Sequence, residues 1–367
     1  MKYSVILPCK DEEATLAICI NKIREVLPKS EIIVVDNNSA DNSALIAKKL
    51  KVKLIKERKP GYGAALLSGF KEVSGDYIII CDADDTYDLS EIPKLIKYKN
   101  YDLVIGSRFK GEIKGGAMPF LHKYIGNPFL SYVLRKFFKI NVKDTHSGFR
   151  LIKKKALEKL ELKTMGMEIA SEMLIKAGKN KLKIKEIPIT YYPRKGHSKL
   201  SSFKDGWRHL RFMLLYSPNY LFLVPGLVLF LFGFLIMLLL LEGPLNIFNL
   251  KLDIHPMIFG SLSAVVGYQV ILLWLYAKTY AVNYLNERDR LITVINKLIN
   301  LERGIFIGLM ILILGVILNL NILIIWINSG FGSLSELRTA VFAFTLVILG
   351  IQTIFSSFFL SILGLRR

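Results

Sequence analysis

Four aspartates lie within seven residues at the end of an apolar run. The run is YIII, residues 77–80, and the aspartates after it are Asp82, Asp84, Asp85 and Asp88. Like charges this close repel one another and lose hydration, so the cluster requires a compensating cation. A hard ion such as Mg²⁺ takes carboxylate oxygens and often completes its shell with substrate phosphates. Asp82 and Asp84, separated only by the small Ala83, are the pair best spaced to bind such an ion together.

Two further residues suit a nucleotide-binding site, one through its side chain and one through its backbone. Asp36 ends the apolar run EIIVVD, where its carboxylate can accept hydrogen bonds from a ribose or a base. Gly61, in KPGYG, fits a backbone turn near the same site. Each motif is weak alone, because Asp-x-Asp also occurs in solvated loops and helix caps. Asp88, which precedes LSEI, suits such a cap.

Positive charge is concentrated in the middle of the chain. Residues 1–100 hold 16 Lys and Arg against 15 Asp and Glu, whereas residues 101–219 hold 25 against 9. This excess favours anionic lipid headgroups or a phosphorylated substrate. Nucleic acid is a weaker explanation, because the sequence has no nucleic-acid-binding motif. The residues able to bind a diphosphate or a lipid phosphate are Arg108, Arg150, Arg194, Lys195, Ser198 and Lys199. For any one lysine the alternative is a solvated surface charge.

His146, in DTHSGFR, has two interpretations. It can orient a phosphate or contact a sugar. It can equally be a structural histidine with Asp144 as its hydrogen-bond partner.

The sequence around these residues alternates strand and helix patterns. Apolar runs such as YSVILP, EIIVVD and YIII are separated by segments with helical spacing, for example EEATLAICINKIREVL. This alternation predicts an α/β domain with a mainly parallel sheet covered by helices on both faces. Ligands bind beyond the carboxyl ends of the strands in such a sheet. The polar clusters at 8–13, 36–41 and 82–88 are therefore expected to meet at one edge.

Four long apolar stretches fill the second part of the chain. They cover residues 220–241, 256–277, 304–327 and 339–363, each near the ~20 residues that a membrane-spanning helix needs. Residues 203–219 begin with an amphipathic pattern typical of a helix in the headgroup layer, although a soluble helix packed on the sheet has the same pattern. We therefore divide the chain into a first domain at 1–202, an interfacial helix at 203–219 and a membrane domain with four transmembrane helices at 220–367.

Charge in the short loops predicts the orientation of these spans. Lys and Arg are more frequent between the second and third spans and at the C-terminus than in the two opposite loops, which assigns the former to the cytosolic side. The N-terminus reaches acidic residues too soon for a signal peptide. We therefore expect an integral protein of the cell membrane with its first domain and both termini in the cytosol. Apolar composition does not decide whether the spans anchor the protein, form a homo-oligomer or guide a lipid.

The order of the motifs resembles one enzyme family. The segments SVILPCKDEEATL, IIVVDNNSADNS, KPGYGAALLSGF, YIIICDADDTYD, GSRF, DTHSGFRLIKKKAL and RKGHSKL are similar to those of the family 2 glycosyltransferases that make polyprenyl-phosphate sugars, the dolichol-phosphate mannose or glucose synthases. The resemblance implies a GT-A domain that uses a nucleotide-diphosphate sugar, Mg²⁺ or Mn²⁺, and a lipid phosphate acceptor, with inversion at the anomeric carbon.

The resemblance also implies roles for individual residues. Those expected to bind the nucleotide sugar are Pro8, Glu12, Asp36, Gly61, Asp82, Ala83 and Asp84. Those expected at the acceptor phosphate are His146, Arg150, Arg194, Ser198 and Lys199. Asp82 and Asp84 are expected to hold the metal, and the residues expected to take part in catalysis are Asp84, Arg108, Arg194 and Lys199. The sequence departs from the family at Thr86, where mannose synthases usually have Gln, and at Asp11, where the first motif usually has Asn.

We therefore predict a metal-dependent hexosyltransferase that moves a hexose from UDP-glucose or GDP-mannose to polyprenyl or dolichyl phosphate. A phosphate monoester is largely anionic at neutral pH, so the site needs positive charge to hold two anions together more than it needs a strong base. Two alternatives remain. One is a processive polysaccharide synthase, which carries a Gln-x-x-Arg-Trp motif where this chain has only DGWRHLRF. The other is a non-catalytic membrane scaffold or transporter with a transferase-like domain.

Overall fold

The computed structural model describes residues 2–195, 202–247, 250–284, 289–298 and 300–364. The chain divides into two compact units, Met1–Tyr216 and Ser217–Arg367. The strands of the first unit are β1 Tyr3–Cys9, β2 Glu31–Asp36, β3 Lys53–Lys56, β4 Tyr77–Ile80, β5 Leu103–Ile113, β6 Arg150–Lys153 and β7 Ile184–Tyr191. Its helices are α1 Leu16–Val26, α2 Ser43–Lys49, α3 Tyr62–Lys71, α4 Ile92–Ile96, α5 Asn127–Phe138, α6 Lys154–Leu160, α7 Ile169–Lys179 and α8 Ser202–Leu215, with the short turns η1 Leu89–Glu91 and η2 His122–Gly126.

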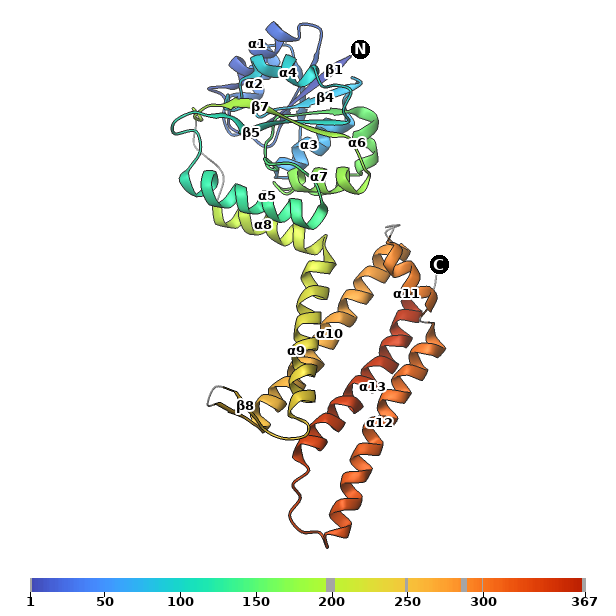
Figure 1. Ribbon diagram of the computed structural model, residues 1–367. Helices are drawn as coiled ribbons and strands as arrows, with labels where there is room; N and C mark the ends of the chain where they lie inside the picture. Colours follow the sequence, from blue (N-terminus) through green and yellow to red (C-terminus); the bar gives the residue numbers. More distant parts are fainter. Residues whose placement is uncertain (1, 196–201, 248–249, 285–288, 299, 365–367) are drawn as a thin grey trace. The chain divides into compact units, whose positions relative to one another are not determined.

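The seven strands form one mainly parallel sheet, as predicted (Figure 1). The strand order is β3-β2-β1-β4-β6-β5-β7. β6 is antiparallel to both of its neighbours, and residue Arg150 at its start lies opposite Ile80 of β4 and Ile105 of β5. Because β6 runs in the opposite direction, the loop before it reaches the same edge as the loops that follow β4 and β5. β6 is not expected from the sequence, because it stands outside the alternation of parallel strands and helices.

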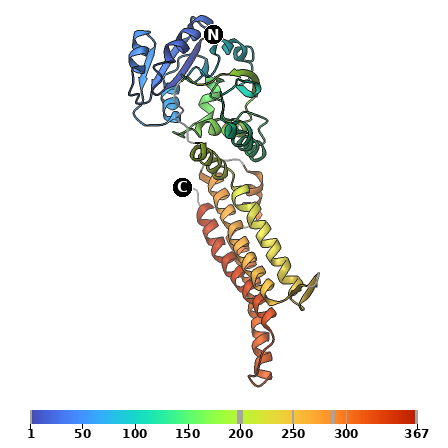
Figure 2. The ribbon, with the colours of Figure 1, turned by 90° about the vertical axis from the view of Figure 1, so that its left-hand side faces the viewer.

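Alternating side chains of the strands fill two apolar cores, one on each face of the sheet. Val5 and Leu7 of β1 join a core with α1, α2 and α4. Ile6 points to the opposite face and joins a core with α3, α5, α6, α7 and Met213 of α8. Both faces are therefore covered by helices (Figures 1 and 2), which explains why the strands read as continuous apolar runs.

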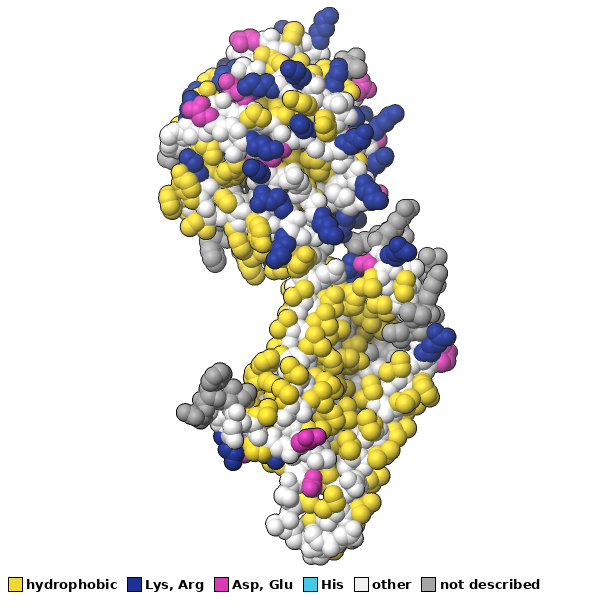
Figure 3. Space-filling view, in the orientation of Figure 1, with side chains coloured by type: hydrophobic (Ala, Val, Ile, Leu, Met, Phe, Trp, Pro, Cys, Tyr) yellow, Lys and Arg dark blue, Asp and Glu magenta, His cyan; other side chains and the backbone are white. Residues whose placement is uncertain are grey.

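The second unit contains four helices long and apolar enough to cross a membrane, as predicted. They lie at Asn219–Leu240, which joins the turn η3 Asn219–Leu223 to α9 Val224–Leu240, at α10 Ile254–Tyr284, at α12 Leu301–Asn328 and at α13 Leu337–Gly364. The hairpin β8 Leu245–Ile247 and β9 Leu250–Leu252 follows α9, and the amphipathic helix α11 Arg290–Leu298 precedes α12. Hydrophobic side chains cover most of the visible face of this unit (Figure 3).

Glycines bring the spans together in two pairs. A Cβ atom on Gly233 of α9 would lie 2.3 Å from the carbonyl oxygen of Gly260 on α10. A Cβ atom on Gly308 of α12 would lie 3.0 Å from the carbonyl oxygen of Gly350 on α13. Small residues that allow backbones to approach closely are a main source of helix association in lipid.

Hydroxyl groups join the two pairs along the contact between α10 and α13. The bonded side chains are Ser261 with Thr345 at 2.7 Å, Tyr268 with Thr353 at 2.7 Å, and Tyr276 with Ser356 at 2.6 Å. Hydrogen bonds of this kind between membrane helices contribute about 0.6 kcal/mol each. Close packing within each pair and polar bonds between the pairs therefore hold the second unit together.

Candidate functional site

The polar loops after β1, β2 and β4 lie at one edge of the sheet. These strands are neighbours and run in parallel, with Cys9 opposite Asp36. The amide of Asn37 donates to the carbonyl oxygen of Cys9 at 2.8 Å. The hydroxyl of Thr15 donates to the carbonyl oxygen of Ala83 at 2.7 Å. The first loop is thus bonded to both others, and the three sequence clusters form one site.

Each of these loops turns through one left-handed residue that is Asp or Asn. Asp11, Asn38 and Asp85 have φ angles of 50°, 60° and 58°. Asp and Asn tolerate this conformation better than other non-glycine residues. Asp11 also accepts a hydrogen bond from the amide of Ala40 at 2.7 Å. An Asn side-chain oxygen can accept the same bond, so the departure at Asp11 preserves the turn.

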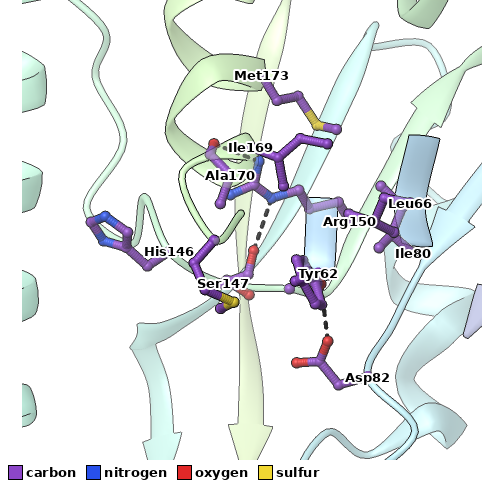
Figure 4. Close-up of a pocket in the computed structure, with 12 residues that line it drawn as sticks. Tyr62, Leu66, Ile80, Asp82, His146, Ser147, Arg150, Ile169, Ala170 and Met173 are labelled. Carbon is purple, nitrogen blue, oxygen red and sulfur yellow. Dashed lines mark hydrogen bonds between the residues drawn. The ribbon is translucent and has the colours of Figure 1, made fainter. Parts of the chain in front are cut away.

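Each carboxylate of the Asp82–Asp84 pair has one oxygen held by a hydroxyl group. Tyr62 donates its hydroxyl to Asp82 Oδ1 at 3.0 Å (Figure 4). Thr86 donates both its backbone amide and its hydroxyl to Asp84 Oδ1, at 3.1 and 2.6 Å. These bonds leave Oδ2 of each carboxylate for other partners.

Basic side chains from two segments compensate the acidic cluster. Arg194, after β7, donates to Asp84 Oδ2 at 2.9 Å. Lys22 of α1 and Lys195 both donate to Asp85, at 2.6 and 2.7 Å. The cation that the crowded aspartates require is thus supplied within the protein, by residues far away in the sequence.

The aspartates differ in their pKa. Burial raises the pKa of Asp82 to about 7, and the charge of Asp84 adds to this effect, while the hydrogen bond from Tyr62 opposes it. For Asp85, burial also acts to raise the pKa, but hydrogen bonds from Lys195 and Lys22 outweigh burial, so that its pKa is lowered. Asp82 is therefore the carboxyl group of the cluster that gains most from a further cation.

The residues present fit a divalent cation. Asp82 and Asp84 supply hard oxygen donors, and the half-buried Asp82 lacks a directly bonded basic side chain among the hydrogen bonds described. Gly148 leaves space beside this carboxylate, because a Cβ atom there would lie 2.8 Å from Asp82 Oδ2. No group of three or more His, Cys, Asp and Glu ligands occurs in the described ranges. Water or substrate oxygens would therefore complete the shell, as they commonly do for Mg²⁺.

Arg108 and Arg150 are buried and bonded within the protein. Arg108 binds Asp144 through two hydrogen bonds, Nε to Oδ2 at 2.8 Å and Nη2 to Oδ1 at 2.7 Å, and its guanidinium lies 5.2 Å from the centre of the Tyr191 ring. Each guanidinium nitrogen of Arg150 donates to a backbone carbonyl oxygen, at 2.8 to 3.0 Å. These three bonds tie the loop before β6 to the start of α7. Arg150 therefore shapes the loop, and its contact with the acceptor phosphate stays a prediction.

His146 is held through one ring nitrogen, while its buried Nε2 has no hydrogen-bond partner among the described residues. Its Nδ1 lies 3.0 Å from the hydroxyl of Thr145, and its ring packs edge-on against His209 of α8 with centroids 4.3 Å apart. Burial, followed by the nearby His209 and Arg108, holds its pKa well below the usual value. The ring is therefore neutral at pH 7 and brings no charge to a phosphate. Asp144, the partner expected from the sequence, binds Arg108 instead.

A small cavity lies beside Asp82 (Figure 4). Its volume is ≈ 40 Å³, and the polar side chains that line it are Tyr62, Asp82, His146, Ser147 and Arg150. A volume of this size has room for water but not for a hexose. The sugar must therefore bind outside this cavity, or the loops must move to enlarge it.

The remaining predicted nucleotide residues line the same edge. Pro8 lies in β1 opposite Val35. Asp36 Oδ1 accepts a hydrogen bond from the amide of Ser39 at 3.1 Å and so stabilises its own loop. Glu12 pairs with Arg194, which joins the first loop to the segment after β7.

Gly61 has a backbone conformation that requires glycine. Its φ angle is 138°, and a Cβ atom there would lie 2.2 Å from the carbonyl oxygen of Met165. Ser198 and Lys199, both predicted at the acceptor phosphate, lie outside the described residues.

Three residues in the site are not identified by any motif in the sequence. Lys22 lies 63 residues from its partner Asp85, and Tyr62 lies 20 residues from Asp82. Tyr191 was also missed, although its ring packs beside Arg108. Only Tyr62 had a usable signal, because it follows the glycine that begins the turn into α3.

An exposed apolar face lies on the segment of η2 and α5. Its side chains, each at least 51% exposed, are Phe120, Leu121, Tyr124, Ile125, Phe129 and Tyr132. The ammonium groups of Lys123 and Lys136 lie 5.3 and 5.9 Å from the centres of the Tyr124 and Tyr132 rings. α5 packs on α8, where Trp207 is 54% exposed. Aromatic and basic side chains on a common surface suit the headgroup layer of a membrane.

Comparison with protein families gives two matches. A model described as glycosyl transferase family 2 matches residues 4–161. A model described as the glycosyltransferase family 2 C-terminal transmembrane region matches residues 275–364.

Two curated proteins are similar in sequence. The low-salt glycan biosynthesis hexosyltransferase Agl6 of Haloferax volcanii is 39% identical over 98% of this chain and 89% of its own length. The dolichol-phosphate mannosyltransferase of Pyrococcus furiosus is 36% identical over 58% of this chain and 62% of its own length.

One solved structure, that of a mycobacterial protein, resembles the chain with a TM-score of 0.51 and 17% identity, over 59% of this chain and 74% of that one. This likeness bears on the fold alone. Together with the match over residues 4–161, it confirms the GT-A α/β fold predicted for the first unit.

Proposed function

The chain belongs to glycosyltransferase family 2 as a membrane glycosyltransferase, and from that premise we propose that it moves one hexose from UDP-glucose or GDP-mannose to a polyprenyl or dolichyl phosphate, with inversion at the anomeric carbon. The observation that carries the proposal is the carboxylate pair Asp82–Asp84 at the end of β4, with Arg194 bonded to Asp84 Oδ2 at 2.9 Å. The names of the relatives from Haloferax volcanii and Pyrococcus furiosus support hexosyl transfer and a dolichol-phosphate acceptor.

On the donor side, Asp82 and Asp84 would hold Mg²⁺ or Mn²⁺, which supplies positive charge to the diphosphate as it leaves. Arg194 lies within bonding distance of the same carboxylate. Its guanidinium, which also pairs with Glu12, would lie beside the diphosphate and could donate to phosphate oxygens, which match its fork of N–H groups. Arg108 adds a buried positive charge whose position is fixed by Asp144.

On the acceptor side, the substrate is an amphiphile with an anionic head and an apolar tail. The exposed apolar face of η2 and α5, together with α8, suits contact with the headgroup layer where such a lipid lies. We assign residues 1–202 to catalysis, 203–219 to the membrane interface and 220–367 to anchoring. We place the catalytic domain and both termini in the cytosol, where nucleotide sugars are available.

The direct test is a transfer assay with the full-length protein in detergent or membranes. Labelled nucleotide sugars are offered one at a time with polyprenyl phosphate and Mg²⁺ or Mn²⁺, and the label in extracted lipid is measured. We expect one donor to give a single lipid product carrying one sugar. A polymeric product would favour a processive synthase, and an absence of transfer from every donor would favour a non-catalytic protein.

The metal role predicts the behaviour of Asp84→Asn. The substitution keeps the shape of the side chain and removes its charge, so we expect the transfer rate to fall by on the order of 10²-fold or more. Asp76→Asn is a matched control outside the cluster, since Asp76 accepts a hydrogen bond from the amide of Lys2. An Asp84→Asn protein with undiminished transfer would contradict the proposed metal site.

A further inference from the structure

Thr86 forms two hydrogen bonds to the carboxylate of Asp84. Its hydroxyl and its amide both donate to Asp84 Oδ1, at 2.6 and 3.1 Å. Thr86 is 2% exposed and Asp84 is 7% exposed. In this buried setting water competes poorly for the carboxylate, so the two bonds fix how the side chain is turned.

The same bonds determine which oxygen of Asp84 faces a cation. A carboxylate oxygen accepts about two strong hydrogen bonds, so Oδ1 is occupied by Thr86. The other oxygen, Oδ2, accepts from the guanidinium of Arg194 at 2.9 Å. Oδ2 is therefore the oxygen of Asp84 that faces a positive charge in this structure.

The backbone of Thr86 also contacts the segment that carries Arg194. Its carbonyl oxygen accepts a hydrogen bond from the amide of Tyr192 at 2.8 Å. A substitution of the side chain leaves this backbone bond in place. The hydroxyl can thus be tested separately from the path of the chain.

From these contacts we propose that Thr86 is a positioning residue that holds Asp84 with Oδ2 presented to the metal ion of the transfer reaction. The inference rests on the proposed function for the identity of the reaction, but not for the contact itself. Thr86 stands where related mannose synthases usually have Gln, and it acts through Asp84 by a hydroxyl bond.

A second pair in the same loop provides a matched control. Ser90 donates its amide and its hydroxyl to Asp88 Oδ1, at 3.0 and 2.6 Å, and this pair is exposed and caps η1. Its local bonding is the same as that of Thr86 with Asp84. Loss of the hydroxyl at Ser90 should therefore leave cation binding unchanged.

The test measures Mn²⁺ binding directly, by the loss of the free-ion signal in electron paramagnetic resonance. Full-length Thr86→Val, Thr86→Ser and Ser90→Ala proteins are titrated alone and with UDP or GDP present. We expect Thr86→Val to weaken Mn²⁺ binding roughly tenfold, the loss of one hydrogen bond to a charged group. Thr86→Ser should restore binding, and Ser90→Ala should match the unsubstituted protein.

A transfer assay adds a second readout. Thr86→Val should raise the Mn²⁺ concentration that gives half-maximal rate, and excess Mn²⁺ should recover most of the rate. The midpoint of thermal unfolding in Mn²⁺-free buffer identifies a variant that fails to fold, and Thr86→Ser then carries the comparison.

Three results would overturn the inference. The first is that Thr86→Val binds Mn²⁺ as tightly as the unsubstituted protein. The second is that Thr86→Ser binds Mn²⁺ as weakly as Thr86→Val. The third is that the unsubstituted protein binds no Mn²⁺, with or without nucleotide. If no sugar donor supports transfer but Thr86→Val still weakens Mn²⁺ binding selectively, the proposed function fails while the role of Thr86 stands.

Discussion

The four aspartates of the acidic cluster have four different environments. Asp82 is half-buried and bonded to a tyrosine hydroxyl, and Asp84 is shared between Thr86 and Arg194. Asp85 is neutralised by two lysines, and Asp88 caps a short helical turn. A group of like charges is tolerable here because each member has a separate means of stabilisation.

The raised pKa of Asp82 predicts that protons compete with the metal ion. Burial, followed by the charge of Asp84, raises this pKa to about 7. A dication binds the ionised carboxylate, so Mn²⁺ affinity should be constant well above pH 7 and fall as the pH drops below it. The measurement is the Mn²⁺ dissociation constant from about pH 5.5 to about 8.5 at fixed ionic strength.

Tyr62→Phe tests whether the pH dependence of Mn²⁺ binding arises from Asp82. The hydrogen bond from Tyr62 lowers the pKa of Asp82, so removing the hydroxyl should move the fall in Mn²⁺ affinity to higher pH. A profile that does not depend on pH in either protein would contradict the assignment of Asp82 to the metal ion.

Single residues were predictable from the sequence where local chemistry identified them. The Asp82–Asp84 pair followed from its spacing, and the cap at Asp88 followed from the residues after it. Lys22 was not predictable, because its bond to Asp85 exists only after α1 packs beside the loop after β4. The hydrogen bonds of Arg150 were not predictable for the same reason, since the carbonyl oxygens that it binds are brought together by the fold.

At the scale of elements, the loop before β6 packs closely on the carboxylate of Asp82 through Gly148. A Cβ atom on Gly148 would lie 2.8 Å from Asp82 Oδ2 and 3.0 Å from Oδ1. Gly148→Ala should therefore displace this carboxylate or the loop. We expect transfer to fall by on the order of 10²-fold, as is common for a displacement of about 1 Å in a catalytic site.

Gly115→Ala is the control for this prediction, because no atom lies within 4 Å of a Cβ at that position. Both proteins should have the same circular dichroism spectrum. Equal transfer rates for the two variants would contradict the prediction, because the loop would then accommodate the methyl group without displacing Asp82.

The strands up to β5 were predictable because their apolar residues alternate along the chain with segments of helical spacing. β6 and β7 were not predicted, since β6 runs antiparallel and stands outside the alternation of parallel strands and helices, and β7 includes the polar residues of IKEIPITY. The apolar face of η2 and α5 was missed for another reason. Its residues mix aromatic, aliphatic and basic side chains, and only the fold shows that they are exposed.

At the scale of the whole molecule, the orientation of the spans is a prediction that chemical labelling can check. Cys9, Cys19 and Cys81 are buried, and burial raises the pKa of the Cys9 and Cys19 thiols to about 12. Buried thiols with a raised pKa react slowly with maleimides. An introduced surface cysteine should therefore give the dominant signal.

The substitutions are Lys155→Cys in the first unit and Glu242→Cys between the first two spans, both at exposed positions. A membrane-impermeant maleimide applied to intact cells should label Glu242→Cys and leave Lys155→Cys unlabelled until the cells are opened. The reverse pattern would place the first unit outside the cell and contradict the charge rule for this protein.

The reversed strand β6 separates the sheet into two parts with different neighbours. On one side of it, β3, β2, β1 and β4 carry the loops with the aspartates, and on the other side β5 and β7 lead to Arg108 and Arg194. Under the proposed function, the first part supplies the carboxylates that would hold the metal ion, and the second part supplies guanidinium groups beside them. Because these two kinds of charge stand on opposite sides of β6, evolution can replace the basic residues of one part while the strands that carry the carboxylates keep their pairing.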